Sequence, residues 1–200
     1  MVAQIKATQI KTNQPETKQN HTKSFTNNPK DTNSPKNVAI VNPVQGYIQV
    51  FVAPQRNLYA DIFAQALRVA GQGTQVLLVQ LFQTGINQGL SNPRRLVENL
   101  EWLRCDAQRD LSNNDIDLTD IEKAAVLELW DYAKVTIQSA NAGLVVLDEA
   151  NLLVARSLIT EEDLLNVIKT RSPKVNIILT GASMPERISN YADQVTQRRN

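Results

Sequence analysis

Cysteine and histidine are almost absent from this 200-residue chain, and their scarcity excludes several kinds of site. Cys105 is the only cysteine, so no intramolecular disulfide can form. His21 is the only histidine, and it lies in a polar N-terminal segment. A zinc site of the usual Cys/His type and a nucleophile activated by histidine are therefore excluded from the apolar part of the chain. Chemistry there must rely on carboxylates, backbone groups or a bound ion.

Apolar side chains are also scarce at the N-terminus. Residues 1–36 consist mainly of Thr, Asn, Gln, Lys and Pro, with Phe25 as their one aromatic residue. Because such a segment buries too little apolar surface to offset the entropy of ordering, we expect a disordered tail over 1–36 and one folded domain over 37–200. The tail lacks the apolar core of a secretory signal, and no later stretch is long enough to cross a membrane. We therefore expect a cytoplasmic protein with no membrane partner.

The chain carries little net charge, but the charge is unevenly distributed. The formal total is +1. Residues 1–36 hold six lysines and two acids, a net charge of +4, whereas residues 37–200 hold fifteen Lys and Arg and eighteen acids, a net charge of −3. A basic tail could bind nucleic acid or an acidic partner. Since only composition supports that hypothesis, we favour a solvated leader and do not expect a nucleic-acid partner.

Strand and helix patterns alternate along the rest of the chain. The β-branched run 46–52 is typical of a strand. A helix should follow, with apolar residues at helical spacing (Leu58, Ile62, Ala66 and Val69) and an end at Gly71-Gln-Gly73. The apolar run 74–81 is typical of a strand buried on both faces. This order predicts a βαβ unit and hence a parallel sheet.

The alternation continues to the end of the sequence. We expect further strands over 101–105, 144–147, 175–179 and 194–196, and helices over 92–100, 119–140, 160–169 and 185–191. Thr160-Glu-Glu-Asp163 is typical of a capping box at the start of the helix 160–169. The longest helix should bury the face formed by Ile121, Ala125, Leu129, Tyr132 and Val135 or Thr136. The pattern predicts an α/β fold with a mostly parallel sheet and helices on both faces.

Polar residues follow two of these strands directly. In open α/β sheets, ligands bind beyond the carboxyl ends of the strands. Asp148-Glu149 follows the apolar run 144–147 in the form of a Walker B motif, where the first acid can hold a Mg²⁺ shell and the second can orient a water or substrate group. An acidic pair at a strand end serves equally well as a helix cap, so both hypotheses stay open. Thr180-Gly181 follows the strand 175–179.

The loop after the first strand lacks the residues of a phosphate-binding loop. In the pattern G-x-x-x-x-G-K-[ST], glycines let backbone N–H groups surround phosphates, lysine neutralises them and the hydroxyl binds Mg²⁺. Residues 53–60 read APQRNLYA, without glycine or lysine, and Pro54 removes one backbone donor.

Several segments, in order, resemble the ATP:corrinoid adenosyltransferases. The matching segments are ALRVAGQG (66–73), LVQLF (78–82), LVVLDEAN (144–151), ILTG (178–181) and YADQVT (191–196), and Trp130 falls where the family has a tryptophan. The resemblance covers roughly 46–82 and 119–199. It implies a P-loop NTPase-like (RecA-like) fold, a homodimer, and transfer of 5′-deoxyadenosyl from ATP, with Mg²⁺, to a reduced corrinoid.

The same resemblance identifies where the chain departs from the family. Leu58 occupies the position of the phosphate-binding lysine, and Tyr59 that of the Mg²⁺-binding threonine. Ala182 replaces an arginine, and the family's Gly-Phe-Thr-Trp stretch has no counterpart between Cys105 and Asp117. Arg56 is a remaining cation in the loop.

Two hypotheses follow from these matches and departures. The candidate ligand-binding residues are Arg56, Asn57, Asp148, Glu149, Asn151 and Thr180, with Asp148 as the candidate Mg²⁺ ligand and no residue assigned as catalytic. In the first hypothesis the protein has lost adenosyl transfer and is a binding or regulatory protein with a protein partner and no assigned cofactor. In the alternative it is an active ATP:cob(I)alamin adenosyltransferase that uses ATP, Mg²⁺ and a corrinoid, with Arg56 acting in place of the lysine.

Overall fold

A computed structural model describes residues 46–54, 60–84, 88–113 and 115–198, all of them in one compact unit, Val41–Asn200. The strands are β1 (Ile48–Val52), β2 (Val76–Thr84), β3 (Leu100–Cys105), β4 (Leu144–Asp148), β5 (Asn176–Gly181) and β6 (Gln194–Gln197). The helices are α1 (Ala60–Gly71), α2 (Asp120–Ser139), α3 (Ala150–Ala155), α4 (Glu161–Lys169) and α5 (Glu186–Tyr191). The predicted tail over 1–36 lies outside the described residues and stays a prediction.

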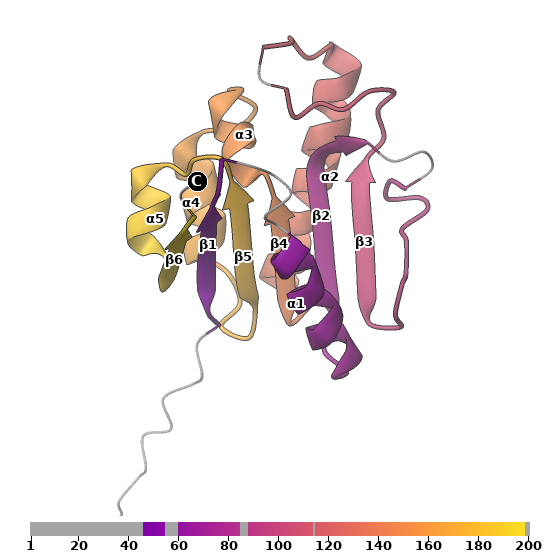
Figure 1. Ribbon diagram of the computed structural model, residues 1–200, viewed down its shortest axis with the longest axis vertical. Helices are drawn as coiled ribbons and strands as arrows, with labels where there is room; N and C mark the ends of the chain where they lie inside the picture. The colour runs from indigo at the N-terminus through magenta and orange to yellow at the C-terminus, as the bar shows by residue number, and fades with distance from the viewer. Residues whose placement is uncertain (1–45, 55–59, 85–87, 114, 199–200) are drawn as a thin grey trace, which may run out of the picture. The chain divides into compact units, whose positions relative to one another are not determined.

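The six strands form one parallel sheet in the order β3-β2-β4-β5-β1-β6 (Figure 1). β1 and β2 are consecutive along the described chain but are not neighbours, because β5 and β4 lie between them. Since all strands run the same way, the carboxyl ends of β2, β4, β5 and β1 lie along one edge, where α/β folds bind ligands. The predicted parallel sheet is confirmed.

Helices cover both faces of the sheet, as predicted (Figure 1). α1 packs Ile62, Ala66 and Ala70 onto one face. On the other face α2, α3, α4 and α5 contribute to a larger core that contains Phe82, Trp130 and Leu153. The strands are buried between these two cores, which explains their near-continuous apolar sequences.

The predicted helix over 92–100 is wrong. This segment runs antiparallel to β3, with Arg94 N–H donating to Trp102 O at 3.0 Å and Trp102 N–H donating to Arg94 O at 2.9 Å. Arg104 N–H also donates to Gln88 O at 3.0 Å. β3 is an edge strand with exposed backbone groups, and pairing these groups outweighs a weak local preference for helix. Residues 88–94 therefore cover the edge of the sheet.

The predicted buried face of α2 is only partly correct: Leu129 and Thr136 are buried as predicted, but Ile121 and Tyr132 are exposed. The helix itself is confirmed, but it buries Val126, Leu129, Trp130, Ala133, Thr136 and Ile137, whereas Ile121 is 82% and Val135 57% exposed. Residues 120–139 carry apolar side chains on two stripes. The stripe that contains Trp130 offers more apolar area to bury, so the helix turns that stripe toward the sheet.

Local capping defines where α2 and α4 begin. The Thr119 side chain accepts a hydrogen bond from Glu122 N–H, and the Glu122 side chain accepts one from Thr119 N–H. Thr160 and Asp163 form the same reciprocal box at α4, as the sequence predicted. No helix in the described part of the chain is long and apolar enough to span a membrane.

Candidate functional site at the strand ends

Asp148 lies at the carboxyl end of β4 and is held on both carboxylate oxygens. The Thr180 hydroxyl donates to Asp148 Oδ1 at 2.7 Å, and Gln80 Nε2 donates to Asp148 Oδ2 at 2.9 Å. Only 6% of Asp148 is exposed. A buried carboxyl group without hydrogen-bond donors would be costly, so these two hydrogen bonds lower the cost of burying Asp148.

Gln80 connects Asp148 to a cation on the neighbouring strand. Gln80 Oε1 accepts hydrogen bonds from Trp102 Nε1 at 2.9 Å and from Arg104 Nε at 2.8 Å. Because two donors face Oε1, the Nε2 group must face Asp148, and the orientation of the amide is fixed. The Arg104 guanidinium lies over the Trp102 ring at 4.6 Å. The Gln80 side chain therefore connects Arg104 on β3 to Asp148 on β4 by two hydrogen bonds.

Sequence reasoning did not identify Gln80 as a site residue. The signal was a glutamine after four consecutive apolar residues in the run 74–81, which was predicted only as a buried strand. A glutamine side chain has four hydrogen-bonding positions, and Trp102, Arg104 and Asp148 on the neighbouring strands fill three of them. Trp102 and Arg104, in the edge strand β3, could not be paired with it without the strand order.

Thr180 also fixes the backbone after Asp148. Glu149 N–H donates to Thr180 Oγ1 at 3.1 Å, so one hydroxyl contacts both members of the acidic pair. Glu149 adopts a left-handed backbone (φ 60°, ψ 35°), which is uncommon for a residue other than glycine. It occupies the N-cap position of α3, yet its side chain makes no capping hydrogen bond. Glu149 therefore occupies the position of a helix cap, but its side chain does not act as one.

Asn151 packs against the end of β5. Only 6% of Asn151 is exposed, and its Oδ1 atom has no hydrogen-bond partner among the described residues. A Cβ atom placed on Gly181 would overlap Asn151 Oδ1, so glycine is required for α3 to lie this close to the end of β5. This contact explains the Thr-Gly pair after β5.

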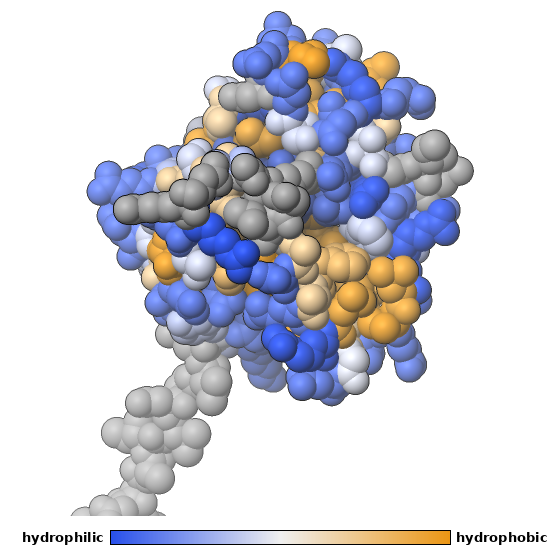
Figure 2. Space-filling model, viewed as in Figure 1, coloured by the Kyte–Doolittle hydropathy of each residue, from blue (hydrophilic) through white to orange (hydrophobic). Residues whose placement is uncertain are grey.

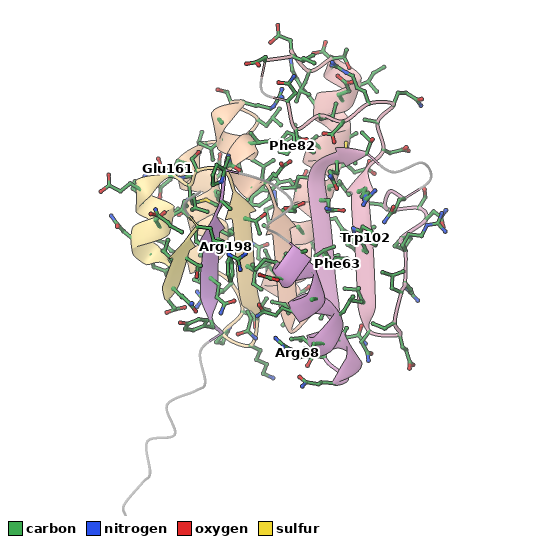
Figure 3. All side chains as sticks on the ribbon, viewed as in Figure 1. Phe63, Arg68, Phe82, Trp102, Glu161 and Arg198 are labelled. Atoms are coloured by element: carbon green, nitrogen blue, oxygen red, sulfur yellow. The ribbon has the colours of Figure 1, made fainter. Side chains whose placement is uncertain are left out.

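A small pocket adjoins these residues between α1 and the sheet. Its volume is about 280 Å³, open solvent included. Gln80, Asp148 and Thr180 form its polar side, and apolar residues such as Phe63 form the rest. Figure 3 shows Phe63 on α1 close to Trp102 on β3, and their ring centroids are 5.0 Å apart in an edge-on arrangement.

The structure brings four of the six candidate residues together. Asp148, Glu149, Asn151 and Thr180 lie at the adjoining ends of β4 and β5, as predicted. Arg56 and Asn57 lie outside the described residues, as do Leu58 and Tyr59. Within the described ranges, no three His, Cys, Asp or Glu side chains are grouped so that they could hold a metal ion.

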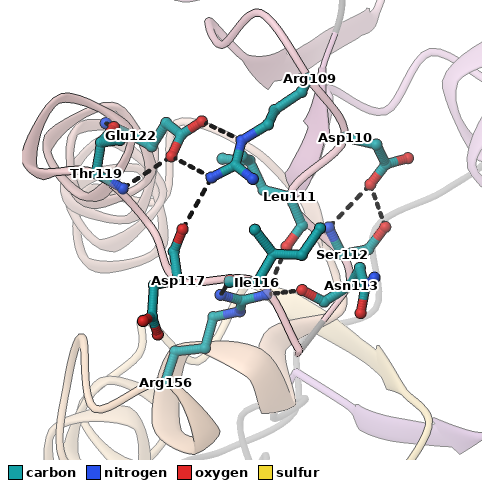
Figure 4. A network of polar contacts seen from close by, with 10 residues as sticks. All are labelled: Arg109, Asp110, Leu111, Ser112, Asn113, Ile116, Asp117, Thr119, Glu122 and Arg156. Carbon is teal, nitrogen blue, oxygen red and sulfur yellow. Dashed lines mark hydrogen bonds and ion pairs between the residues drawn. The ribbon is translucent and has the colours of Figure 1, made fainter.

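Two arginines hold the segment between β3 and α2 (Figure 4). This is the segment in which the family's Gly-Phe-Thr-Trp stretch has no counterpart. Arg156 donates to the carbonyl groups of Leu111, Asn113 and Ile116. Arg109 forms an ion pair with Glu122 at 2.7 Å and donates to Asp117 O at 2.8 Å. These bonds give this segment a defined conformation, although its sequence is polar and irregular.

The ion pair also changes the titration of Glu122. The hydrogen bonds from the Arg109 side chain and from Thr119 N–H lower the pKa of Glu122 from 4.5 to about 2. Donors that favour the charged carboxylate act in this direction.

Comparison with known proteins agrees with this geometry. The sequence model of the family described as "ATP:corrinoid adenosyltransferase BtuR/CobO/CobP" matches residues 45–200. A corrinoid adenosyltransferase of Escherichia coli is 26% identical over 166 residues, which cover 81% of each chain. The corrinoid adenosyltransferase CobA of Salmonella typhimurium is 25% identical over the same share of each chain. An uncharacterised Nostoc protein matches over 77 residues at 29% identity, covering 38% of this chain and 20% of its own length.

Proposed function

Because the chain belongs to the ATP:corrinoid adenosyltransferase family, we propose that it keeps the family's fold, has lost ATP-dependent adenosyl transfer, and acts as a binding or regulatory protein. The observation that carries the proposal is the loop 53–60, in which Leu58 and Tyr59 stand in place of the phosphate-binding lysine and the Mg²⁺-binding threonine. Neither side chain can neutralise a phosphate or coordinate Mg²⁺ as those residues do.

The size of the loss supports the proposal. A hydrogen bond to a charged group contributes roughly 1.5–3 kcal/mol. Losing two of them would remove about 3–6 kcal/mol of phosphate binding if the effects add. Since each 1.4 kcal/mol is a factor of ten, affinity for the nucleotide would fall by about a hundredfold to more than ten-thousandfold. A micromolar site would become millimolar or vanish.

The contacts of Asp148 point the same way. Mg²⁺ bound with a nucleotide needs carboxylate oxygens or their water shell, together with the hydroxyl of the loop. Both Asp148 oxygens accept hydrogen bonds from protein side chains, one from Thr180 and one from Gln80. Protein side chains therefore hold the Asp148 carboxylate in place, and its position does not depend on a bound Mg²⁺ ion.

An active ATP:cob(I)alamin adenosyltransferase is the second candidate. It is favoured by the juxtaposition of Asp148, Glu149 and Thr180 at the strand ends, where a P-loop protein places its metal-binding residues. In this case Arg56 would supply the positive charge of the loop. The corrinoid would be the acceptor of the adenosyl group.

Adenosyl transfer by the purified protein separates the two candidates. Reduced cobalamin is incubated with ATP and Mg²⁺, and adenosylcobalamin is followed by its absorbance, with the Escherichia coli corrinoid adenosyltransferase as the positive control. The proposal predicts no product above the protein-free background. Product formation that Arg56→Ala abolishes would establish the second candidate instead.

The proposal extends to the setting of the protein. We place it in the cytoplasm as a homodimer that binds another protein. The family's habit supports the dimer, and the single buried thiol is compatible with a reducing compartment. Analytical ultracentrifugation of the full chain tests the dimer, and a monomer at all concentrations would contradict it.

A further inference from the structure

We propose that the apolar run 38–44 of this chain binds in a groove between α2 and α4 of the same molecule. The run reads VAIVNPV and lies outside the described residues, which begin at Gly46. It contains four β-branched residues and one alanine, and no charged residue. The inference does not depend on whether the protein binds a nucleotide.

The groove follows two neighbouring helices of the larger core. Its volume is about 690 Å³, open solvent included. Its apolar part consists of Leu127 and Trp130 on α2, Val167 on α4, and Ile159 just before α4, and polar side chains of the two helices form the rest. Leu127 and Ile159 are only half-buried. An elongated surface with such an apolar part favours an apolar occupant.

The described chain begins beside one end of the groove. Thr170, which caps the C-terminal end of α4, lines the groove. The next residue, Arg171, is buried and donates to Gly46 O at 2.6 Å. Ser172 N–H donates to Ile137 O in the last part of α2 at 3.4 Å. The C-terminal ends of both helices therefore meet the point from which the preceding apolar run extends.

The length of the run matches the length of the groove. Along α2, the residues that line the groove extend from Leu127 to Gln138. At 1.5 Å per residue, this distance along the helix is about 16 Å. An extended chain advances about 3.3 Å per residue, so five residues of the run cover the groove and the others connect it to Gly46.

A second pocket near the start of β1 fits the run less well. It lies on the α1 face of the sheet, is lined by Tyr47, Gln65 and Val69 among others, and has a volume of about 360 Å³, open solvent included. Gln65 and Val69 are one helical turn apart, about 6 Å, which is the length of about two extended residues. Figure 2 shows that the largest hydrophobic area on this face lies on the β3 side of α1, whereas this pocket lies on the β1 side.

Charge and tethering favour the chain's own run over a segment of another molecule. The charged side chains that line the groove are Asp131, Lys134 and Asp163. Lys134 forms an ion pair with Asp131, and Asp163 accepts hydrogen bonds from Thr160. Since these charges already have partners, an uncharged occupant suits the groove. A run joined to Gly46 through one residue also has an effective concentration of about millimolar at the groove.

Disulfide trapping in the full chain tests the proposal. Val41→Cys combined with Asn166→Cys places one thiol in the run and one on the exposed side of α4 that lines the groove. We expect an intramolecular disulfide under mild oxidation, seen as a faster-migrating monomer on a non-reducing gel. Val41→Cys combined with Gln65→Cys, in the second pocket, should form its disulfide about tenfold more slowly. Cys105 does not compete, because burial raises its pKa to about 12.

Matched variants make the result decisive. Ile40→Asp, added to the Val41/Asn166 pair, should slow trapping to the rate of the Val41/Gln65 pair, because it puts an unpaired charge into the apolar run. Ile10→Asp, outside the run, should leave the rate unchanged. Equal rates for the two cysteine pairs, no effect of Ile40→Asp, or disulfides only between two molecules would overturn the proposal. None of these outcomes bears on adenosyl transfer, which is measured separately with the unmodified protein.

Discussion

The Thr180 hydroxyl is the residue-scale feature on which the strand-end site depends. It donates to Asp148 Oδ1 and accepts from Glu149 N–H, so it fixes both acids and the left-handed backbone of Glu149. All three groups lie at adjoining strand ends where water is largely excluded. A buried polar group that loses its partner keeps the full cost of its desolvation.

Thr180→Val should therefore lower the free energy of unfolding by about 1–3 kcal/mol, because it removes the hydroxyl and keeps the shape. Thr180→Ser keeps the hydroxyl, so its free energy of unfolding should fall by less than that of Thr180→Val. Urea unfolding followed by tryptophan fluorescence measures both variants. Equal stability of the Val variant and the unmodified protein would show that the hydroxyl does not hold the acids.

The Cys105 thiol should be unreactive in the folded protein. Burial, with a smaller contribution from the Asp106 charge, raises the pKa of Cys105 to about 12, and the thiolate is the reactive form. A chromogenic disulfide reagent at mildly alkaline pH should release no signal from the native protein. The denatured chain, as the control, should react with one thiol per chain. Rapid reaction of the native protein would contradict the buried position of Cys105 on β3.

At the scale of elements, the segment between β3 and α2 takes its conformation from Arg156, which lies at the end of α3. Its guanidinium binds three backbone carbonyl groups of that segment and lies 5.8 Å from the centroid of the Phe82 ring. An arginine that satisfies carbonyl groups in this way replaces the hydrogen bonds that regular structure would supply.

Arg156→Gln should therefore increase hydrogen exchange in residues 106–113 and 115–118 by about tenfold or more, with smaller changes in the strands. Arg187→Gln is the matched control, because Arg187 forms an exposed ion pair with Glu162 that should contribute little. Mass spectrometry of proteolytic fragments locates the effect. Unchanged exchange in the segment would mean that Arg156 does not hold it.

The Arg109–Glu122 pair makes the start of α2 sensitive to acid. In the folded protein the pKa of Glu122 is about 2, against 4.5 in its ordinary state. The unfolded chain thus takes up the proton at higher pH, and the stabilisation by Glu122 is complete above pH 4.5 and lost as the pH falls toward about 2. In Glu122→Gln, the urea midpoint should fall less steeply as the pH is lowered from 4.5 toward about 2. Glu98→Gln, at an exposed position, should leave the steepness of this fall unchanged. A fall of the same steepness in Glu122→Gln would refute the assignment.

The sequence predicted those elements whose signals are local. Apolar runs located β2, β4 and β5, and the Thr160–Asp163 box located the start of α4. The helix predicted over 92–100 is wrong because pairing with β3, a tertiary contact, decides the conformation of this segment. α2 was placed correctly, but its buried face was predicted only in part. Leu129 and Thr136 are buried as expected and Ile121 is exposed, because the packing against the sheet decides between two apolar stripes.

The candidate site was predicted in the same unequal way. Asp148, Glu149, Asn151 and Thr180 follow strands, so the rule for parallel sheets brought them together. Gln80, Trp102 and Arg104 were missed because their connection depends on the strand order β3-β2-β4, which no local pattern reveals.

At the scale of the whole molecule, the chain keeps its family's scaffold, and we propose that the loop 53–60 has lost the chemistry of phosphate binding. The sheet and its strand-end acids are intact, and the acids are held by protein groups. Loss of nucleotide binding would therefore not require a loss of folding stability. A loop that regains the lysine and the threonine should regain the nucleotide if the scaffold still positions it.

Calorimetric titration with ATP and Mg²⁺ of the unmodified protein and of the Leu58→Lys/Tyr59→Thr variant tests this claim most directly. We expect no binding by the unmodified protein at micromolar ATP and measurable binding by the variant. Micromolar binding by the unmodified protein would contradict it and would establish a working nucleotide site in the altered loop.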